Sequence, residues 1–325
     1  MTFDRREFLP LVVGAAALLA MPAIASAQSY PTRPVHVIVG FAAGGPNDTV
    51  ARLLGQTLSE RLGQQFVIEN RTGAASNIGT EAVVRAAPDG YTLLLVSSAN
   101  AVNATLYDNL SYNFIRDIAP VASVLRVPNL MVVNPAVPAR TIPEFIAYAK
   151  ANAGKINMAT SGNGSTTHTS GELFKLMAGV DLVTVAYRGG APALIDLIAG
   201  QTQVMFEPTI AAMEYVKAGK LRALAVTSTR RSELLPDVPT VAEFVPGYEA
   251  SQWYGVGAPK GTPPEVIAKL NSEINAALAD PKLKARLSDL GAELTPMTGA
   301  EFGKLIADET EKWAKVVRSA NLKPE

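Results

Sequence analysis

Two glycine-bearing turns carry the residue types that could do chemistry in this sequence. They span Phe41–Asp48 and Ser161–His168, and each follows an apolar run and precedes a helical pattern. Each is therefore predicted to be a strand-to-helix turn. A helix N-terminus offers free backbone N–H groups with a partial positive charge, and glycine lets a ligand approach the backbone. The turns favour binding of an anion, although a glycine turn can also simply connect two elements.

Catalytic patterns fit these turns poorly. The run Ser161–Ser165 lacks the G-x-S-x-G pattern of a nucleophile elbow, and His168 lies too close in sequence to be a clear base. No G-K-[ST] follows Gly44 and Gly45, and no G-x-G-x-x-G follows a strand. We expect a binding protein without catalysis, with no cofactor and no metal, and an α/β enzyme is the weakest alternative.

Several polar side chains near the turns have two readings. Asn47 or Asp48 could cap the first helix, and a cap is favoured over a ligand contact for Asp48. His168 could touch the ligand or hold its turn, and Arg188 could pair with the ligand or form an ion pair. Glu207 ends a strand that we expect to face a cleft, with a structural role slightly favoured.

The elements that position the turns alternate as strands and helices, the doubly wound signature. The first unit reads β-α-β-α-β, with an irregular stretch over 101–117, and the second unit repeats this logic. Separate apolar runs at 121–125 and 130–133 leave the first unit, and an extended run at 252–257 returns to it. Further patterns predict helix starts, at Thr141, Thr262, Asp280 and Thr298, and a capping-box spacing at Thr169 and Glu172. We expect domain 1 at 28–125 and 248–325 and domain 2 at 126–247, with a cleft between them.

Composition narrows the function classes. Lys and Arg total 29 and Asp and Glu total 29, without basic clusters, which argues against nucleic acid. There is no cysteine, so disulfides and thiol catalysis are excluded, and His36 and His168 are the only histidines. A histidine-rich metal site is therefore not expected.

The N-terminus reads as an export signal. Arg5 and Arg6 precede a short apolar run that ends before Ala25-Ser26-Ala27, and this predicts cleavage near Ala27–Gln28 and a periplasmic protein. The paired arginines resemble a twin-arginine signal, but Asp4 stands where Ser or Thr is usual, so the general secretory route stays open.

Several motifs together resemble one family, the extracytoplasmic solute receptors of tripartite tricarboxylate transporters, also called Bug-type receptors. They cover the mature chain in order: residues 41–52, 67–74, 87–93, 162–168, 187–190 and 235–240. The resemblance implies a two-domain periplasmic-binding-protein-like α/β fold of type II, each domain a mixed sheet flanked by helices. It also implies closure over a small carboxylate, with Ala43, Gly44 and Gly45 in one ligand loop and Ser161, Ser165, Thr166, Thr167 and His168 in the other.

The leading hypothesis is a periplasmic receptor, expected to be monomeric, that hands a di- or tricarboxylate or an aromatic acid to a membrane permease. A sensor subunit for a membrane kinase is the alternative with the same fold. The candidate ligand contacts are Phe41, Ala43, Gly44, Gly45, Asp48, Asn77, Ser98, Ser161, Ser165, Thr166, Thr167, His168, Arg188 and Glu207.

Overall fold

The computed structural model describes residues 30–187 and 189–324, apart from the side chain of Ile210. Residues 33–325 form one compact unit, separate from the residues before it, and every described helix and strand lies in this larger unit. The predicted signal segment, 1–27, and Arg188 are outside the described residues.

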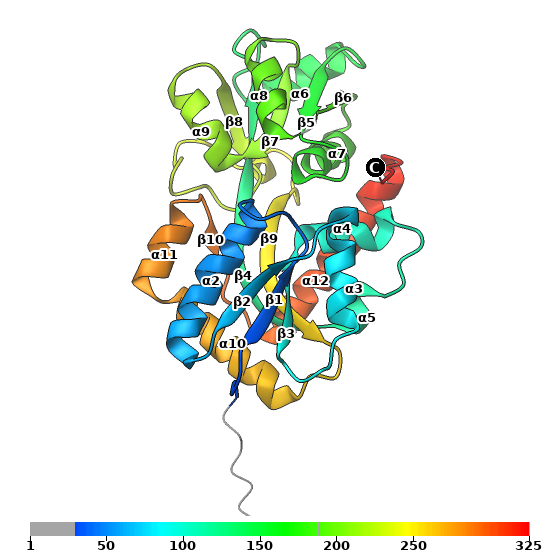
Figure 1. Cartoon of the computed structure of the whole chain (residues 1–325). Helices are drawn as coiled ribbons and strands as arrows, with labels where there is room; N and C mark the ends of the chain where they lie inside the picture. The colour runs from blue at the N-terminus through cyan, green and yellow to red at the C-terminus, as the bar shows by residue number, and fades with distance from the viewer. Residues whose placement is uncertain (1–29, 188, 325) are drawn as a thin grey trace, which may run out of the picture. The chain divides into compact units, whose positions relative to one another are not determined.

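The first lobe begins with the predicted β-α-β-α-β order (Figure 1). Strand β1 pairs in parallel with both β2 and β3, and its apolar residues 37–39 are buried. Helix α2 ends at Gly63, which has the left-handed φ of +66° that favours glycine. The elements are β1 (Val35–Val39), α2 (Pro46–Leu62), β2 (Phe66–Asn70), η1 (Ala74–Ser76), α3 (Asn77–Val84) and β3 (Thr92–Ser97).

The stretch predicted to be irregular, 101–117, is largely helical. It contains most of α4 (Ser98–Leu106) and all of α5 (Phe114–Asp117). A capping box between Ser97 and Asn100 starts α4. The prediction was wrong because Asn100 and Asn103 interrupt the apolar pattern, yet both are buried and hydrogen-bonded to neighbouring elements.

The two lobes share strand β4 (Ile118–Val133), which pairs with β9 (Ser251–Pro259) in the first lobe. Residues 118–128 of β4 pair with β9, and residues 129–133 pair with β7 and β8 of the second lobe. The apolar runs predicted to be separate are thus parts of one continuous strand. Strand β9 lies between β3 and β4, which confirms the predicted return to the first unit.

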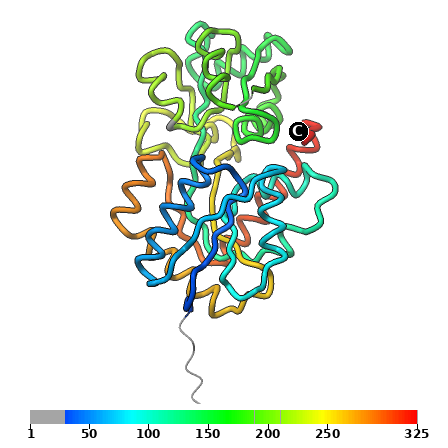
Figure 2. Tube along the Cα trace, viewed as in Figure 1, coloured from blue at the N-terminus to red at the C-terminus, as the bar shows by residue number. Residues whose placement is uncertain are grey.

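The second lobe, mostly green along the trace in Figure 2, contains a mixed sheet with helices. Strand β5 pairs in parallel with β6 and β7, whereas β7 and β8 are antiparallel to β4. Helix α6 starts at the predicted cap Thr141. The elements are α6 (Ile142–Ala151), β5 (Asn157–Thr160), α7 (Thr166–Ala178), β6 (Val183–Ala186), α8 (Gly190–Ile198), β7 (Val204–Pro208), α9 (Thr209–Lys217), β8 (Arg222–Val226) and η2 (Val241–Glu243).

The chain closes with helices that pack on the first lobe. They start where the sequence predicts, with Asp280 and Thr298 as side-chain caps of α11 and α12. Within the described residues no helix combines the length and apolar character needed to cross a bilayer. The elements are α10 (Pro264–Leu278), α11 (Pro281–Ser288), β10 (Glu293–Leu294) and α12 (Gly299–Ser319).

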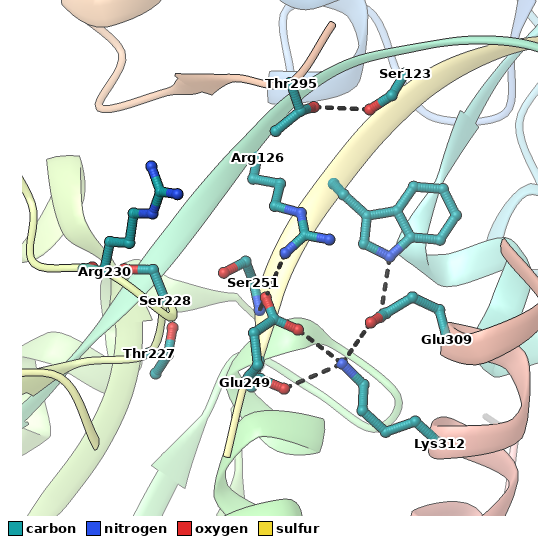
Figure 3. Close-up of polar contacts among 12 residues, drawn as sticks. Ser123, Arg126, Thr227, Ser228, Arg230, Glu249, Ser251, Thr295, Glu309 and Lys312 are labelled. Carbon is teal, nitrogen blue, oxygen red and sulfur yellow. Dashed lines mark hydrogen bonds and ion pairs between the residues drawn. The ribbon is translucent and has the colours of Figure 1, made fainter. Parts of the chain in front are cut away.

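A buried charged network fastens α12 to the strands that join the lobes (Figure 3). Lys312 Nζ donates to Glu249 Oε2 at 2.8 Å and to Glu309 Oε1 at 2.6 Å. Two indole N–H groups, of Trp253 and Trp313, donate to Glu309 Oε2. Burial opposes ionisation of Glu249, but Lys312 and then Arg126 hold its pKa below the usual value. Since Glu249 lies two residues before β9, the network fixes the point where the chain re-enters the first lobe.

We expect Lys312→Met to lower the free energy of unfolding by about 1–3 kcal/mol at pH 7, because it removes the ammonium group that Glu249 and Glu309 share, and Arg126 remains for Glu249 alone. The matched control is Lys315→Met, on the same helix. Lys315 pairs with Glu311, and both side chains are mostly exposed, so its loss should cost less than about 0.5 kcal/mol. Urea unfolding of both variants tests this, and equal losses would contradict the structural role of the network.

Candidate ligand-binding cleft

A cavity of about 530 Å³ is lined by both lobes. The first lobe contributes the segments after β1 and β2 and one face of α4, and the second lobe contributes residues 161–166, 169 and 170. Residues 250–252, at the start of β9, complete the lining together with Trp313 and Pro324 near the C-terminus. Cavities of this size at a domain junction hold small molecules.

Among the described helices, three have N-termini that reach this cavity. Asn47 lies in the first turn of α2, Ser98 is the first residue of α4, and Thr166 is the first residue of α7, and all three line the cavity. The first turn of a helix presents backbone N–H groups and a partial positive charge. The arrangement suits an anionic ligand.

Two buried hydroxyls in the lining are unused by the protein. The side chains of Ser98 and Ser251 belong to residues 2% exposed, and neither Oγ has a hydrogen-bond partner among the residues described. A buried hydroxyl without a partner is costly. These two groups therefore keep unused hydrogen-bonding capacity in the wall of the cleft.

The first glycine turn is organised differently from the prediction. The N-cap of α2 is Gly45, so the expectation of a cap from Asn47 or Asp48 was wrong. Asp48 reaches back instead and accepts from Gly44 N–H at 2.8 Å, while Arg52 and Asn70 donate to the same carboxylate. The Arg52 hydrogen bond is the main cause that lowers the pKa of Asp48 to about 2, against the effect of burial.

Only part of that turn reaches the cavity. Phe41 lines it, whereas Ala43, Gly44, Gly45 and Asp48 are not among the lining residues. The Gly44 N–H is already occupied by Asp48, and the Gly45 N–H points to the Ala42 carbonyl at 3.4 Å. The first turn thus offers fewer free amides than the sequence suggested.

The second glycine turn is held by its own side chains. Ser165 caps α7 by accepting from the His168 N–H, and its hydroxyl donates to Gly162 O at 2.6 Å. Thr167 Oγ1 accepts from the Ser161 N–H at 2.7 Å, so Thr167 stabilises the turn from within and does not line the cavity. The residues of this set that do line it are Ser161, Ser165 and Thr166.

His168 supports the turn and lies outside the lining of the cleft. The Gly164 N–H donates to its Nδ1 at 3.2 Å, so Nε2 carries the proton and faces Glu172 Oε1 at 3.6 Å. Thr169 and Glu172 form no capping box, because Ser165 caps the helix and Glu172 bonds Lys175 and Thr184. His168 and Glu172 line a separate cavity beside the C-terminal segment.

The remaining predicted contacts lie away from the lining. Asn77 is buried behind it, where its Oδ1 accepts from Asn103 and Tyr112. Glu207 is 5% exposed and lies against Gly190, where an added Cβ would be 2.7 Å from its Oε1. The expectation that Glu207 faces the cleft is not met, and Arg188 is outside the described residues.

Sequence reasoning missed the wall formed by Ala74 and Ala75. Their φ values are +45° and +49°, and Ser76 follows at +82°. Consecutive left-handed residues other than glycine store strain, which is typical of ligand sites. Asn103 stabilises this loop by donating to Ala75 O at 2.6 Å. Ser251 and Gln252 were missed because only the tertiary return of β9 brings them to the cavity.

Comparison with known proteins decides the family. The family described as "Tripartite tricarboxylate transporter family receptor" matches residues 50–322. The chain belongs to this family. Protein BugT of Bordetella pertussis is 40% identical over 301 residues, which cover 92% of each chain.

Two solved structures extend the comparison to the fold of this receptor. R. palustris Rpa4515 with adipate is 37% identical, with a TM-score of 0.76 over 91% of this chain and 100% of that one. The periplasmic binding protein BugD is 38% identical, with a TM-score of 0.73 over 91% and 100%. The predicted two-domain periplasmic-binding-protein-like fold is confirmed.

Among the described residues no cluster of His, Asp and Glu could hold a metal ion.

The buried carboxyl of Glu207 predicts a pH dependence of stability. Burial raises its pKa to about 7 in the folded receptor, from 4.5 for an ordinary glutamate. The folded state therefore keeps a proton that the unfolded chain releases. This contribution to stability is fully present below about pH 4.5 and is lost as pH rises through about 7.

Glu207→Gln should remove the loss of stability that occurs as pH rises, because glutamine carries no ionisable group. We expect the variant to be about 1–3 kcal/mol more stable than the parent at pH 8.5 and nearly equal to it at pH 4. Thermal unfolding at both pH values measures the difference. Glu214→Gln, at a side chain 81% exposed, is the control. A difference between Glu207→Gln and the parent that does not vary with pH would contradict the assignment.

Proposed function

We propose that this receptor captures a small organic carboxylate in the 530 Å³ cleft by closure of its two lobes and delivers it to a membrane permease. The observation that carries the proposal is the convergence of three helix N-termini from both lobes on one cavity. The relative Rpa4515 has adipate bound, which supports a carboxylate. A ligand that contacts both lobes at once favours the closed state.

The domain limits and ligand contacts follow from the same proposal. Domain 1 is assigned to 28–125 and 248–325, and domain 2 to 126–247. Direct contacts are assigned to five of the predicted residues, and supporting roles in the ligand loops to Ala43, Gly44, Gly45, Asp48, Asn77, Thr167 and His168. The five direct contacts are Phe41, Ser98, Ser161, Ser165 and Thr166. The exported, monomeric receptor begins after cleavage near Ala27.

Two other functions share this fold. A sensor subunit for a membrane kinase would bind the same ligand, and neighbouring genes for one small and one large polytopic membrane protein would favour transport instead. An enzyme is disfavoured because both ring nitrogens of His168 face protein groups, Gly164 and Glu172. We expect no turnover of any carboxylate that binds.

Isothermal titration of the mature chain against a panel of carboxylates tests the proposal. At least one acid should bind with micromolar affinity, near −8 kcal/mol. Well-folded receptor that gives no heat with any acid in the panel would refute carboxylate capture.

The contact between lobes at Gly164 gives a test of closure. An added Cβ at Gly164 would lie 3.1 Å from Leu106 Cδ2 of the first lobe, and the residue has a φ of +72°. Gly179 has a similar φ of +61° but nothing within 4 Å of an added Cβ. Both alanine variants should lose comparable stability through backbone strain.

Only Gly164→Ala should also weaken the bound acid, by about three- to tenfold, because the added methyl group opposes closure. Titration of the tightest-binding acid into both variants measures this. Equal affinities of the two variants would mean that the closed state does not use this contact.

A further inference from the structure

The segment that follows α12, residues 321–324, lies beside the cleft (red in Figure 1). Pro324 lines the cleft itself. Residues 321–323 line a second cavity, of about 720 Å³, which α7 and β6 of the second lobe also line. The whole segment lines a third cavity, of about 490 Å³, together with residues 104–108 of the first lobe. The segment therefore has residues of both lobes as neighbours at one side of the cleft.

The three cavities share walls. Leu106, Tyr107 and Pro324 border both the cleft and the third cavity. Asn163 borders both the cleft and the second cavity. Residues 321–323 border the second and third cavities. The segment is thus part of the partition between these cavities, and its removal would open the cleft sideways into a larger space.

A left-handed residue turns the chain at the end of α12. Asn321 directly follows the helix C-cap, Ala320, and has a φ of +48°. The Asn321 N–H donates to Arg318 O at 3.2 Å, and the Leu322 N–H donates to Val317 O at 3.0 Å. This pair of bonds is a Schellman motif, which depends on the left-handed residue. The course of the segment beyond the helix is therefore set by the conformation of Asn321.

The part of the segment that borders the cleft is weakly held. The side chain of Leu322 is half-buried and packs against the main hydrophobic core. Lys323 and Pro324 are exposed, and neither forms a hydrogen bond or an ion pair with another described residue. Regions with few buried contacts and few hydrogen bonds open at a low cost in free energy. This part can therefore move while α12 stays folded.

We propose that residues 321–324 form a strap that closes one side of the cleft, and that its displacement gives solutes a route into the cavity without separation of the lobes. The strap separates the cleft from the two neighbouring cavities, and the turn at Asn321 and the packing of Leu322 hold it in place. Access by this route does not depend on which acid binds, so the strap adds a step to ligand exchange beyond the proposed capture.

A single introduced thiol reports access to the cleft, because the sequence has no cysteine. Ser98→Cys places this thiol in the cleft wall, at a residue 2% exposed. We expect iodoacetamide to alkylate it about threefold faster when the chain ends at Leu322, which removes Pro324 but keeps the turn. We expect a rise of about tenfold when the chain ends at Ala320, because the whole strap is then absent.

The matched control is Ala277→Cys, a buried position on α10 that does not line the cleft. Its thiol should react at the same slow rate in all three chain lengths. An equal acceleration at both thiols would mean that truncation loosens the whole protein, and would overturn the strap.

Two full-length variants test the strap without shortening the chain. Asn321→Val disfavours the left-handed turn, because a β-branched side chain is strained there, whereas Asn321→Gly adopts this conformation freely. Both remove the same side-chain amide. Asn321→Val should raise the alkylation rate of the Ser98→Cys thiol by about threefold, and Asn321→Gly should leave that rate unchanged.

The outcomes separate the strap from the proposed function. Equal alkylation rates of the Ser98→Cys thiol in all chain lengths and in both Asn321 variants would overturn the strap, whichever acid the receptor binds. A carboxylate panel that gives no heat in titration would refute carboxylate capture alone, since the access measurement uses no ligand.

Discussion

The antiparallel pairing of β4 with β9 is the constraint on which the rest of the structure depends. Strand β4 is continuous across the junction, so the strand that pairs with β9 in the first sheet passes directly into the second sheet, where it pairs with β7 and β8. Backbone hydrogen bonds fix the register of these strands and therefore the position at which the lobes face each other. The network of Arg126, Glu249 and Lys312 adds side-chain bonds at the same place.

The polar groups in and around the cleft differ in whether the protein supplies their hydrogen-bond partners. The two glycine turns satisfy most of their own donors, through Asp48 in one and through Ser165 and Thr167 in the other. The hydroxyls of Ser98 and Ser251, in contrast, have no hydrogen-bond partner among the described residues. Rigid turns and unpaired hydroxyls together describe a preorganised site, because little has to be ordered when the ligand arrives. The loops thus provide shape, and the floor of the cleft provides the free hydrogen-bonding capacity.

Much of the fold could be predicted from the sequence because local signals agree with tertiary structure. Strand β1, the stop of α2 at Gly63 and the caps of α6, α11 and α12 are examples. Helix α4 could not be predicted from apolar periodicity, since it buries asparagines that bond to other elements. Strand β4 looked like two runs because polar and proline residues lie between them.

The site was harder to predict than the fold. Glycine turns indicated the correct region, but which amides stay free depends on side chains such as Asp48 that fold back on their own loop. His168 has a residue type that suits catalysis, and only its partners show that it braces a turn. Ser251 lies 90 residues after Ser161 and reaches the cleft through strand pairing, which no local pattern encodes.

Asn103 has two structural roles, because it lines the cleft and its side-chain amide donates a hydrogen bond to the carbonyl of the strained residue Ala75. A substitution at Asn103 would change the surface that contacts the ligand and would also remove the hydrogen bond that holds the loop, so it should affect both binding and stability. Side chains with a single duty are freer to vary. We therefore expect substitutions that change ligand preference to occur at the half-exposed residues of α4, whereas Asn103 and the strained loop at Ala74–Ser76 should tolerate fewer substitutions.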